Sequence, residues 1–267
     1  MIDNIKVSII TVCYNSEKYI EQTIQSVLRQ TYGNIEYIVV DGMSTDSTPA
    51  IIERYADKIS KVIRGKDKNM YDAINKGMVA STGDYIEILN SDDMLSNEHV
   101  IENTVKLIDL YKDKYEVFYG DDQKFYQDKG VIKERSKIQT DFKELLCSQK
   151  LTFVGHGAVF ISRKAYESIG EYDCDRFWAA ADYDYLLRLF RKFPCKHIKT
   201  VVQTFRVHGS SITSSGRIDQ EIDEVLKKNG YYNLLSCRRV FEYYKGWTRF
   251  WFVNLQPMIK YYVKGIL

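Results

Sequence analysis

The sequence predicts an α/β protein with a mixed, mostly parallel sheet flanked by helices and a C-terminal helical tail, and three observations support this fold class. Short runs rich in β-branched residues alternate with segments of helical period, which is the rhythm of a parallel sheet. The first of these apolar runs end in Asp, Asn or Gly, residues that favour turns. A chain of 267 residues, 45% hydrophobic and 28% charged, is long enough to bury the core of one large domain.

Four predicted strands, each followed by a predicted helix, make up the N-terminal part of the chain. Asn15 and Ser16 follow the first strand as a turn and helix-capping signal. Pro49 suits the first turn of the second helix, because its missing N–H group needs no partner there. The four pairs are strand 6–14 with a helix through 28, strand 35–41 with helix 47–56, strand 60–64 with helix 71–80, and strand 84–89 with helix 97–112.

The alternation loosens in the second half of the chain. Predicted strands lie at 116–122, 154–162 and 196–207, and predicted helices at 163–169 and 182–192. We find no internal repeat and no low-complexity segment, and the chain has only three prolines. We therefore expect one compact domain over residues 1–215 and a helical tail over residues 216–267.

Charge, cysteine usage and hydropathy narrow the class of protein. With 38 Lys and Arg against 36 Asp and Glu, the net charge of +2 argues against a general nucleic-acid footprint. Five cysteines with no CxxC pair favour a reducing compartment over a disulfide scaffold. The N-terminus lacks the pattern of a signal peptide, and no apolar run reaches the ~18 residues of a spanning helix. We expect a cytoplasmic protein.

Acidic residues stand where predicted strands stop. Asp41, Asp92 and Asp93 each follow an apolar run, and Asp72 comes just after another. Each of them alone is more simply a turn former or helix cap. Together they would converge on one edge, because ligands of open α/β sheets bind beyond the carboxyl ends of the strands.

A hard divalent cation, Mn²⁺ or Mg²⁺, is the simplest partner for the adjacent Asp92 and Asp93 carboxylates, which would otherwise repel each other. Zinc is disfavoured, because the four histidines and five cysteines lack zinc-ligand spacing. The sequence also contains no GxxxxGK[ST] loop and no GxGxxG after its first strand, so P-loop and NAD-type phosphate binding are unsupported.

Four segments in order resemble the successive motifs of the family-2 inverting glycosyltransferases, which have the GT-A fold. They are VSIITVCYNSEKYIEQTIQSVLRQTYGNIEYIVVDGMSTDSTPAII, DKNMYDAINKG, STGDYIEILNSDD and AADYDYLLRL. The resemblance covers residues 5 to about 210 with spacing intact. It implies a nucleotide-binding half at 1–95 and an acceptor-binding half at 96–215.

The resemblance implies a nucleotide site made by three segments. Asp41 matches the aspartate that accepts a hydrogen bond from uracil, and Asp72 and Lys76 match the segment bordering the nucleotide and the donor sugar. The turn after the first strand matches the one that holds the base and ribose, through Thr11, Tyr14, Asn15 and Glu17.

The same resemblance assigns roles around the metal ion. Asp92 is expected near the ribose or the sugar, and Asp93 is expected to ligate the metal that bridges the diphosphate. His208 lies where a loop could close over the phosphates and is a further metal or phosphate contact in this interpretation. A simpler alternative for His208 is an exposed loop histidine.

Catalysis needs a carboxylate that takes the proton of the attacking hydroxyl. Asp182 matches the family's base position, although many relatives have Glu-Asp where this chain has Ala181-Asp182. Asp184 is a rival on the acceptor side, but residues two apart on a helix point in different directions, so at most one should face the substrate. His156 resembles a position lining the acceptor site, with a structural histidine as the alternative.

The tail has its own chemistry. Residues 238–267 carry six basic side chains and the single acid Glu242, and nine aromatic residues follow position 240. Basic, aromatic, amphipathic segments lie in membrane interfaces, where polyprenyl-linked acceptors would be found. A helix packed on the body or a dimer interface are the alternatives.

These inferences lead to one leading hypothesis and two alternatives. The first is an enzyme, a hexosyl- or N-acetylhexosaminyltransferase of the bacterial surface-polysaccharide type. It moves a sugar from a nucleotide-diphosphate donor, a UDP-sugar, to a hydroxyl of a glycan or lipid-linked saccharide with inversion. A nucleotidyltransferase would need a Gly-rich phosphate loop, which the first strand-end lacks. A non-catalytic nucleotide- or glycan-binding module would not need Asp182.

Overall fold

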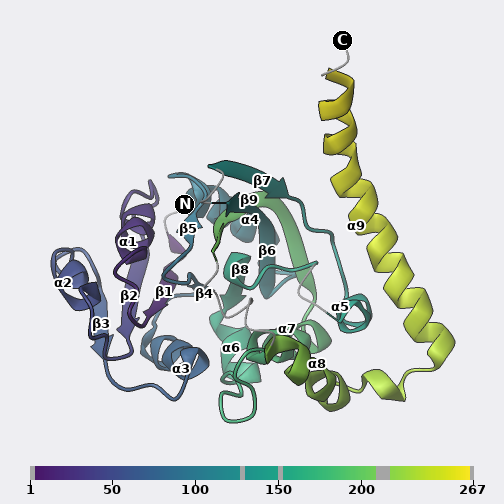
Figure 1. Cartoon of the computed structure of the whole chain (residues 1–267), viewed down its shortest axis with the longest axis horizontal. Coiled ribbons are helices and arrows are strands. Elements are labelled where there is room, and N and C mark those ends of the chain that lie inside the picture. Colours follow the sequence, from purple (N-terminus) through teal and green to yellow (C-terminus); the bar gives the residue numbers. More distant parts are fainter. Residues whose placement is uncertain (1–3, 127–129, 150–152, 209–216, 265–267) are drawn as a thin grey trace.

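The computed structural model describes residues 4–126, 130–149, 153–208 and 217–264 and is organised around one nine-stranded sheet (Figure 1). Its strand order is β3-β2-β1-β4-β8-β6-β9-β5, with β7 paired to β6. The strands are β1 Val7–Cys13, β2 Ile35–Asp41, β3 Lys61–Arg64, β4 Tyr85–Ile88, β5 Met94–Leu95, β6 Val117–Tyr126, β7 Val131–Arg135, β8 Val159–Ser162 and β9 Cys195–Val207.

The sheet is parallel in its N-terminal part and mixed beyond it. β1 pairs in parallel with both β2 and β4, and β2 pairs in parallel with β3. β8 is antiparallel to β4 and β6, whereas β6 and β9 are parallel. The carboxyl ends of β1, β2 and β4 therefore lie at one edge, as expected from the sequence.

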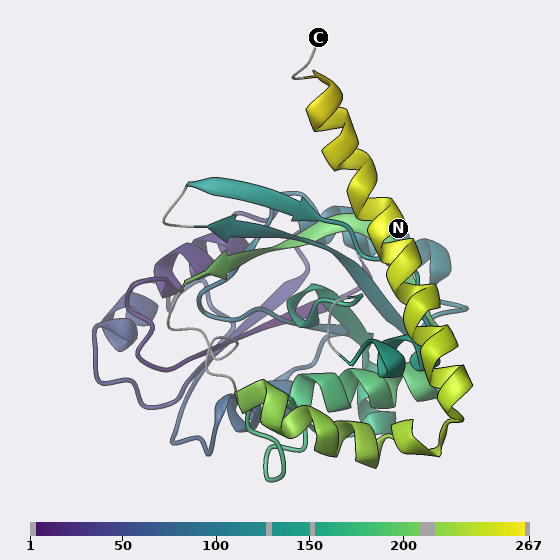
Figure 2. The ribbon, with the colours of Figure 1, turned by 45° about the vertical axis from the view of Figure 1, so that its right-hand side comes forward.

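Helices cover the sheet, and the last and longest of them, α9, extends beyond the body at its C-terminal end. The α-helices are α1 Ile20–Leu28, α2 Thr48–Glu53, α3 Met70–Ala80, α4 Val100–Tyr111, α5 Phe142–Ser148, α6 Arg163–Ile169, α7 Ala181–Lys192, α8 Arg217–Lys228 and α9 Ser236–Lys264. Figures 1 and 2 show α9 running along the side of the molecule on which α5 lies, with its C-terminal end extending away from the body.

The core occupies both faces of the sheet. All seven residues of β1 are buried, because its side chains alternate between two apolar clusters. Ile9 packs in the cluster with α1 and α4, and Ile10 in the cluster with α3 and α7. α3 lies so close to β1 that any side chain at Gly77 would collide with Ile10, so glycine is required there.

Several element boundaries differ from the sequence prediction. The first helix begins at Ile20, because residues 16–19 form a turn before it. The strand expected at 154–162 is reduced to β8, preceded by a short 3₁₀ helix, His156–Ala158. The two-residue β5, the charged β7 and the short helix α5 were not predicted. Their periodic patterns are too short or too polar to stand out.

Glu87 is an unusual member of the core. It lies in β4 between Ile9 of β1 and Phe160 of β8 and is fully buried, and neither carboxyl oxygen has a hydrogen-bond partner among the described residues. Burial, followed by the charge of Asp93, raises the pKa of the Glu87 carboxyl well above 4.5. The folded protein therefore holds Glu87 as the neutral acid.

We predict that Glu87→Gln flattens the dependence of folding stability on pH. Above pH 4.5 the unfolded chain loses the Glu87 proton and the folded chain keeps it, so the free energy of unfolding falls as pH rises. The slope removed should approach about 1.4 kcal/mol per pH unit. Urea unfolding of both proteins at a series of pH values measures it. Parallel profiles would show that Glu87 ionises normally in the fold.

Candidate active site at the carboxyl edge of the sheet

Three loops meet where β1, β2 and β4 end. The Asn15 N–H group donates to Ser44 Oγ at 2.9 Å, and the Asn15 side-chain oxygen accepts from the Thr45 N–H group at 2.9 Å. Ser16 Oγ lies 2.9 Å from Ser91 Oγ. Asn15 has a φ of 48°, a left-handed conformation that Asn tolerates better than most residues. The loops after β1, β2 and β4 are thus held together by side chains.

The predicted nucleotide-binding residues at the end of β1 differ in exposure, because Thr11 is buried whereas Tyr14 and Glu17 are exposed. Thr11 is fully buried in β1, and its hydroxyl accepts a hydrogen bond from the Tyr37 hydroxyl at 3.1 Å. This geometry does not support a side-chain contact between Thr11 and a nucleotide, so we assign Thr11 to the core. Tyr14 is 63% exposed, and the exposed Glu17 accepts from the Ser47 N–H group at 2.9 Å.

Asp41 lies at the end of β2, directly across from Cys13 of β1. Its carboxylate is buried and accepts from the Ser44 N–H group and from Arg64 Nε, both at 3.0 Å. An ionised carboxylate can accept about four hydrogen bonds, so acceptor capacity remains beside these two partners. Arg64, which closes β3, was missed by sequence reasoning because a strand-end arginine carries no distinguishing motif.

Asp72 and Lys76 lie one turn apart on α3 and form an ion pair at 3.0 Å. Lys76 Nζ also lies 2.5 Å from Asp67 Oδ1, and the second oxygen of Asp67 closely approaches Gly42 in the loop after β2. The structure thus brings both predicted residues to the edge next to Asp41. It adds Asp67, which sequence reasoning had treated only as part of a motif.

Asp92 and His208 form a contact across the site. Asp92 Oδ2 lies 2.8 Å from His208 Nε2, although 116 residues separate them in sequence. The two side chains are 29% and 13% exposed, so solvent or a ligand reaches them. The Tyr19 ring lies 5.0 Å from the His208 ring and supports one side of the imidazole. The structure therefore joins two residues that the sequence could only place separately.

Asp93 points into the protein. It is fully buried, and its carboxylate accepts from Gln203 Nε2 at 2.5 Å and from the Arg206 N–H group at 2.9 Å. Burial, and then the neighbouring charge of Asp92, raise the pKa of the Asp93 carboxyl. Both oxygens are engaged in joining the turn after β4 to β9, so this geometry does not support Asp93 as the metal ligand expected from the sequence.

Two further residues of this region were missed by sequence reasoning. Arg206 is buried, donates from Nε to the Asp92 carbonyl oxygen at 2.9 Å, and lies over the Tyr19 ring at 4.7 Å. The Asn90 side chain is hydrogen-bonded to Asp93, and its buried oxygen has no hydrogen-bond partner within the part of the chain that the structure describes. Its position two residues before Asp92 at a strand end was the available signal.

Asp182 lies at the start of α7 and is only partly buried. Its Oδ1 accepts from the Tyr183 N–H group at 2.8 Å, and its side chain is hydrogen-bonded to Tyr71 of α3. Burial raises the pKa of the Asp182 carboxyl, while His156 and these hydrogen bonds oppose that rise. Because Tyr71 directly precedes Asp72, the expected base lies next to the nucleotide half of the edge.

Aromatic rings line the protein side of Asp182. Tyr172 stacks on Tyr185 with ring centroids 4.0 Å apart and lies 5.7 Å from Tyr71. The Tyr172 hydroxyl lies 2.8 Å from His156 Nε2. Burial lowers the pKa of His156, so the imidazole is held neutral. The charge of Asp182 opposes this shift, so the two side chains are close enough to interact electrostatically, and the acceptor-side role of His156 stays a prediction.

Asp184 does not share the position of Asp182. It is fully buried, and it binds Arg188 Nε, Lys228 Nζ and Asn229 Nδ2, each at 3.0 Å. These contacts join α7 to α8. We therefore correct the expected acceptor role of Asp184 to a structural one, which agrees with the argument that only one of the two carboxylates can face a substrate.

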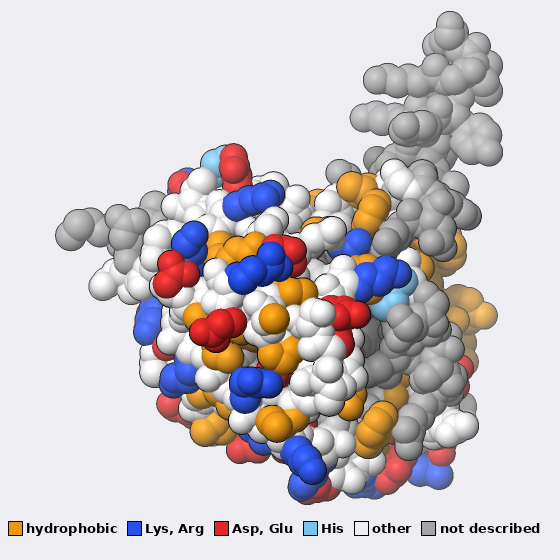
Figure 3. Space-filling view, turned by 60° about the vertical axis from the view of Figure 1, so that its left-hand side comes forward, with side chains coloured by type: hydrophobic (Ala, Val, Ile, Leu, Met, Phe, Trp, Pro, Cys, Tyr) orange, Lys and Arg blue, Asp and Glu red, His pale blue; other side chains and the backbone are white. Residues whose placement is uncertain are grey.

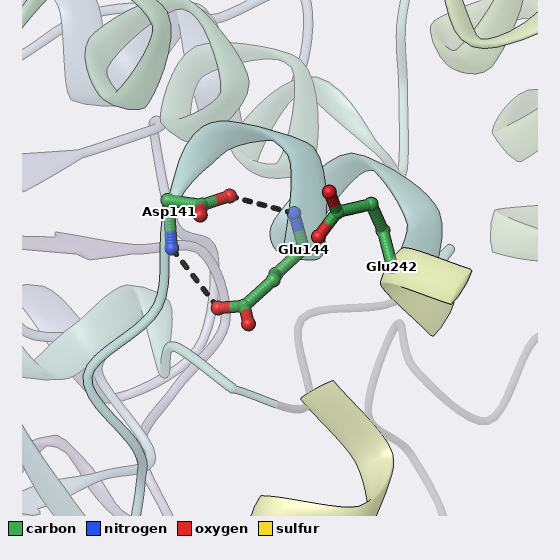
Figure 4. Close-up of side chains that lie close together, drawn as sticks. All are labelled: Asp141, Glu144 and Glu242. Carbon is green, nitrogen blue, oxygen red and sulfur yellow. Dashed lines mark hydrogen bonds between the residues drawn. The ribbon is translucent and has the colours of Figure 1, made fainter. Parts of the chain in front are cut away.

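A separate acidic cluster lies away from the carboxyl edge. Asp141 and Glu144 form a capping box at the start of α5, and Glu242 of α9 approaches them (Figure 4). Lys245 Nζ lies 3.0 Å from Glu144 and 3.3 Å from Glu242, and Arg249 Nη1 lies 3.1 Å from Glu144. Because cations of α9 neutralise this cluster, we interpret it as an ion-pair network that fixes α9 to α5.

α9 also packs through apolar contacts. Phe153 contacts Gly246 and lies 5.6 Å and 5.7 Å, between ring centroids, from Trp247 and Phe250. One face of the tail is thus bound to the body, as one of the alternatives predicted. Over the described residues, none of the helices combines the length and apolar composition needed to cross a bilayer.

The fold and this edge define a class of protein. A parallel β3-β2-β1-β4 unit with acidic loops at its carboxyl ends, extended by a mixed β8-β6-β9 unit, is the GT-A arrangement of nucleotide-diphosphosugar transferases. Residues 8–170 match the family model described as glycosyl transferase family 2, and the chain belongs to this family. The protein is therefore a glycosyltransferase, which decides against both alternatives left open by the sequence.

Relatives agree with this assignment. The chain is 30% identical over 184 residues, 68% of each chain, to the uncharacterized glycosyltransferase Rv1514c of Mycobacterium tuberculosis. The structure of S. aureus TarS 1–349 in complex with UDP matches 92% of this chain and 72% of its own, with a TM-score of 0.69 and 18% identity. Glucosyl-3-phosphoglycerate synthase from M. tuberculosis, with Mn²⁺ and UDP, matches 85% and 80% at a TM-score of 0.60 and 18% identity.

We predict that Asp184→Ala destabilises the protein by about 2 kcal/mol, because it removes the buried carboxylate that Arg188, Lys228 and Asn229 share and leaves each of them with fewer partners. Thermal or urea unfolding measures this loss. Asp182→Asn is the matched control on the same helix and should change stability by under about 1 kcal/mol. Equal stability of Asp184→Ala and the parent would contradict the structural role.

Proposed function

We propose that the protein transfers a sugar from a UDP-sugar to a hydroxyl of a glycan or lipid-linked saccharide, with inversion at the anomeric carbon. The observation that carries this proposal is the Asp92–His208 pair at the edge where the loops after β1, β2 and β4 meet. The UDP complexes of two solved structures with this fold support the choice of donor. In this proposal Tyr14, Asn15, Glu17 and Asp41 lie around the base and ribose.

The residues present fit a divalent metal ion, Mn²⁺ or Mg²⁺. We assign it to Asp92 and His208, with the Asn90 oxygen, which has no partner among the described residues, nearby in the same turn. Carboxylate and amide oxygens suit both ions, and imidazole is a common metal ligand. A bound ion would supply positive charge for the departing diphosphate. Lys76, held beside Asp72, adds a fixed positive charge at the same edge.

Asp182 acts as the general base in this proposal. The acceptor hydroxyl oxygen bonds to the anomeric carbon as the bond from that carbon to the diphosphate oxygen breaks, and the hydroxyl proton passes to the Asp182 carboxylate. The neutral His156 beside Asp182 would line the acceptor site without repelling that proton. Tyr71 and the Tyr183 N–H group orient the carboxylate.

We further propose a cytoplasmic location at the inner face of the plasma membrane, with α9 at the membrane surface. The basic, aromatic composition of residues 238–267 supports this location, which would bring the acceptor side near polyprenyl-linked saccharides. On the face shown in Figure 3, acidic and basic side chains of the described residues are interspersed. This gives no support to a nucleic-acid partner.

We predict that the protein slowly hydrolyses one UDP-sugar in a panel of UDP-, GDP- and dTDP-sugars, and only with Mn²⁺ or Mg²⁺.

Asp92→Ala and His208→Ala should each lower metal-dependent UDP affinity at least about tenfold, in the range for lost metal-site contacts. Calorimetry with and without Mn²⁺ measures the affinity. In the folded protein, Asp93→Asn should retain more metal dependence than Asp92→Ala. If Asp93→Asn instead lost more of the metal dependence of UDP binding than Asp92→Ala, Asp93 would be the metal ligand.

We predict that Asp182→Asn keeps UDP-sugar affinity and lowers kcat for transfer by about 10²- to 10⁴-fold, the usual contribution of a general base. Because the pKa of Asp182 is raised above 3.8, the parent should lose activity as pH falls through a value above that of an ordinary aspartate. Rates measured across pH test this acid limb. Transfer by Asp182→Asn at the parent rate would remove Asp182 from the mechanism.

A further inference from the structure

An exposed tryptophan lies just before the start of α7. Trp178 is 45% exposed, whereas the residues on either side of it, Phe177 and Ala179, are buried. A single exposed apolar side chain needs no explanation by itself. Two further observations, the hydrogen bonds of its backbone and its distance from Asp182, indicate that the Trp178 ring has a use.

The backbone around Trp178 is fixed to α8 by one carboxylate. The Trp178 N–H group lies 3.0 Å from both carboxylate oxygens of Glu221. The N–H groups of Ala179 and Ala180 donate to Oε2 of the same carboxylate at 2.8 Å and 2.9 Å. These N–H groups lie at the N-terminal end of α7, where the helix dipole favours a negative charge. Hydrogen bonds to an ionised carboxylate are also stronger than those between neutral groups.

Two side-chain contacts hold the same segment, 176–180, against α8. Arg176 Nε lies 2.6 Å from Glu224 Oε1, and Lys228 Nζ lies 5.1 Å from the centroid of the buried Phe177 ring. The loop before α7 is thus attached at three positions along α8. Binding residues commonly lie on loops that a rigid scaffold positions, and an aromatic side chain with two torsion angles loses little entropy on binding.

Trp178 is close to the proposed base. It precedes Asp182 by four residues, which span at most about 14 Å even in a fully extended chain. The start of α7 at Ala181 shortens this distance. The three residues between them are alanines, and all three are buried. Because Asp182 is partly exposed, Trp178 and Asp182 are the two side chains of this stretch that reach solvent.

The chemistry of an indole ring suits a saccharide. A sugar ring presents C–H groups on its faces, and these pack on the electron-rich face of an aromatic ring while the hydroxyls stay hydrated. Among the described residues of 96–215, Trp178 is the one exposed aromatic side chain. The acceptor half therefore offers a stacking surface of this kind beside Asp182.

We propose that the exposed ring of Trp178 stacks on a sugar ring of the acceptor and so selects saccharides over other hydroxyl compounds. This inference rests on the proposed function and specifies its acceptor side. A second copy of the chain is a poorer occupant of this position. One exposed ring between buried neighbours offers far less area than the interface of a stable dimer needs.

The first test is tryptophan fluorescence of the full chain with UDP and Mn²⁺ present. The probes are soluble oligosaccharides of glucose, galactose, mannose and N-acetylglucosamine. At least one of them should shift the emission of the parent to shorter wavelength in a saturable way, because the stacked sugar excludes water from the ring. The shift should be absent from Trp178→Phe and retained in Trp251→Phe. Trp251 of α9 is the matched control, since it is 53% exposed.

The second test is UDP release from the UDP-sugar at increasing concentrations of the oligosaccharide that binds. Trp178→Ala should raise the KM for this acceptor about tenfold with little change in kcat, because stacking is equal in the substrate complex and the transition state. Trp178→Tyr should recover most of this loss, and Trp251→Ala should match the parent. Calorimetry should show that Trp178→Ala keeps the affinity for UDP, and urea unfolding checks that it is folded.

Three results would overturn the proposal. They are no emission shift of the parent with any oligosaccharide, a shift that survives in Trp178→Phe, and a parent-like acceptor KM in Trp178→Ala. Self-association of the parent that Trp178→Ala abolishes would assign the ring to a second copy instead. Failure of the proposed function is distinguishable from these results. It would appear as a parent that neither binds UDP nor releases it from any UDP-sugar, and the fluorescence test does not depend on that chemistry.

Discussion

The buried Asp93 carboxylate is the interaction on which the arrangement of the site depends. It follows β4, at the end of the parallel part of the sheet, and accepts hydrogen bonds from Gln203 and from the Arg206 N–H group of β9. A buried carboxylate with fewer partners would cost several kcal/mol, so these contacts define the register of the two segments. Arg206 adds a second connection by donating to the Asp92 carbonyl oxygen.

The buried contacts of Asp93 and Arg206 determine where the partly exposed Asp92 and His208 lie. Asp92 precedes Asp93 and His208 lies two residues beyond Arg206, so fixing the buried residues brings Asp92 and His208 to 2.8 Å. On the other side of the edge, Tyr71 of α3 connects Asp182 to the nucleotide half in the same way. Buried contacts thus orient the side chains that, in the proposed function, face the substrate.

Helices and strands with strong local patterns could be predicted from the sequence. The orientation of individual site residues could not, because it depends on packing between segments that are distant in the sequence. β1, β2 and β4, and the acidic loops after them, follow from apolar runs that end in turn residues. Which of Asp92 and Asp93 faces outward depends on partners over a hundred residues away, so no local pattern distinguishes them. Asp182 and Asp184 could be separated, because helical period alone puts them on different faces. Glu87 carries no sequence signal of its buried, neutral state.

The central claim is that Asp92 and His208, rather than Asp93, face the diphosphate end of the donor. A crystal structure with UDP and Mn²⁺, with the ion located by anomalous scattering at the manganese edge, tests it most directly. We expect the ion on Asp92 and His208 with the uracil near Asp41. An ion held by Asp93 in a rearranged turn, or by the Asp141, Glu144 and Glu242 cluster, would contradict it.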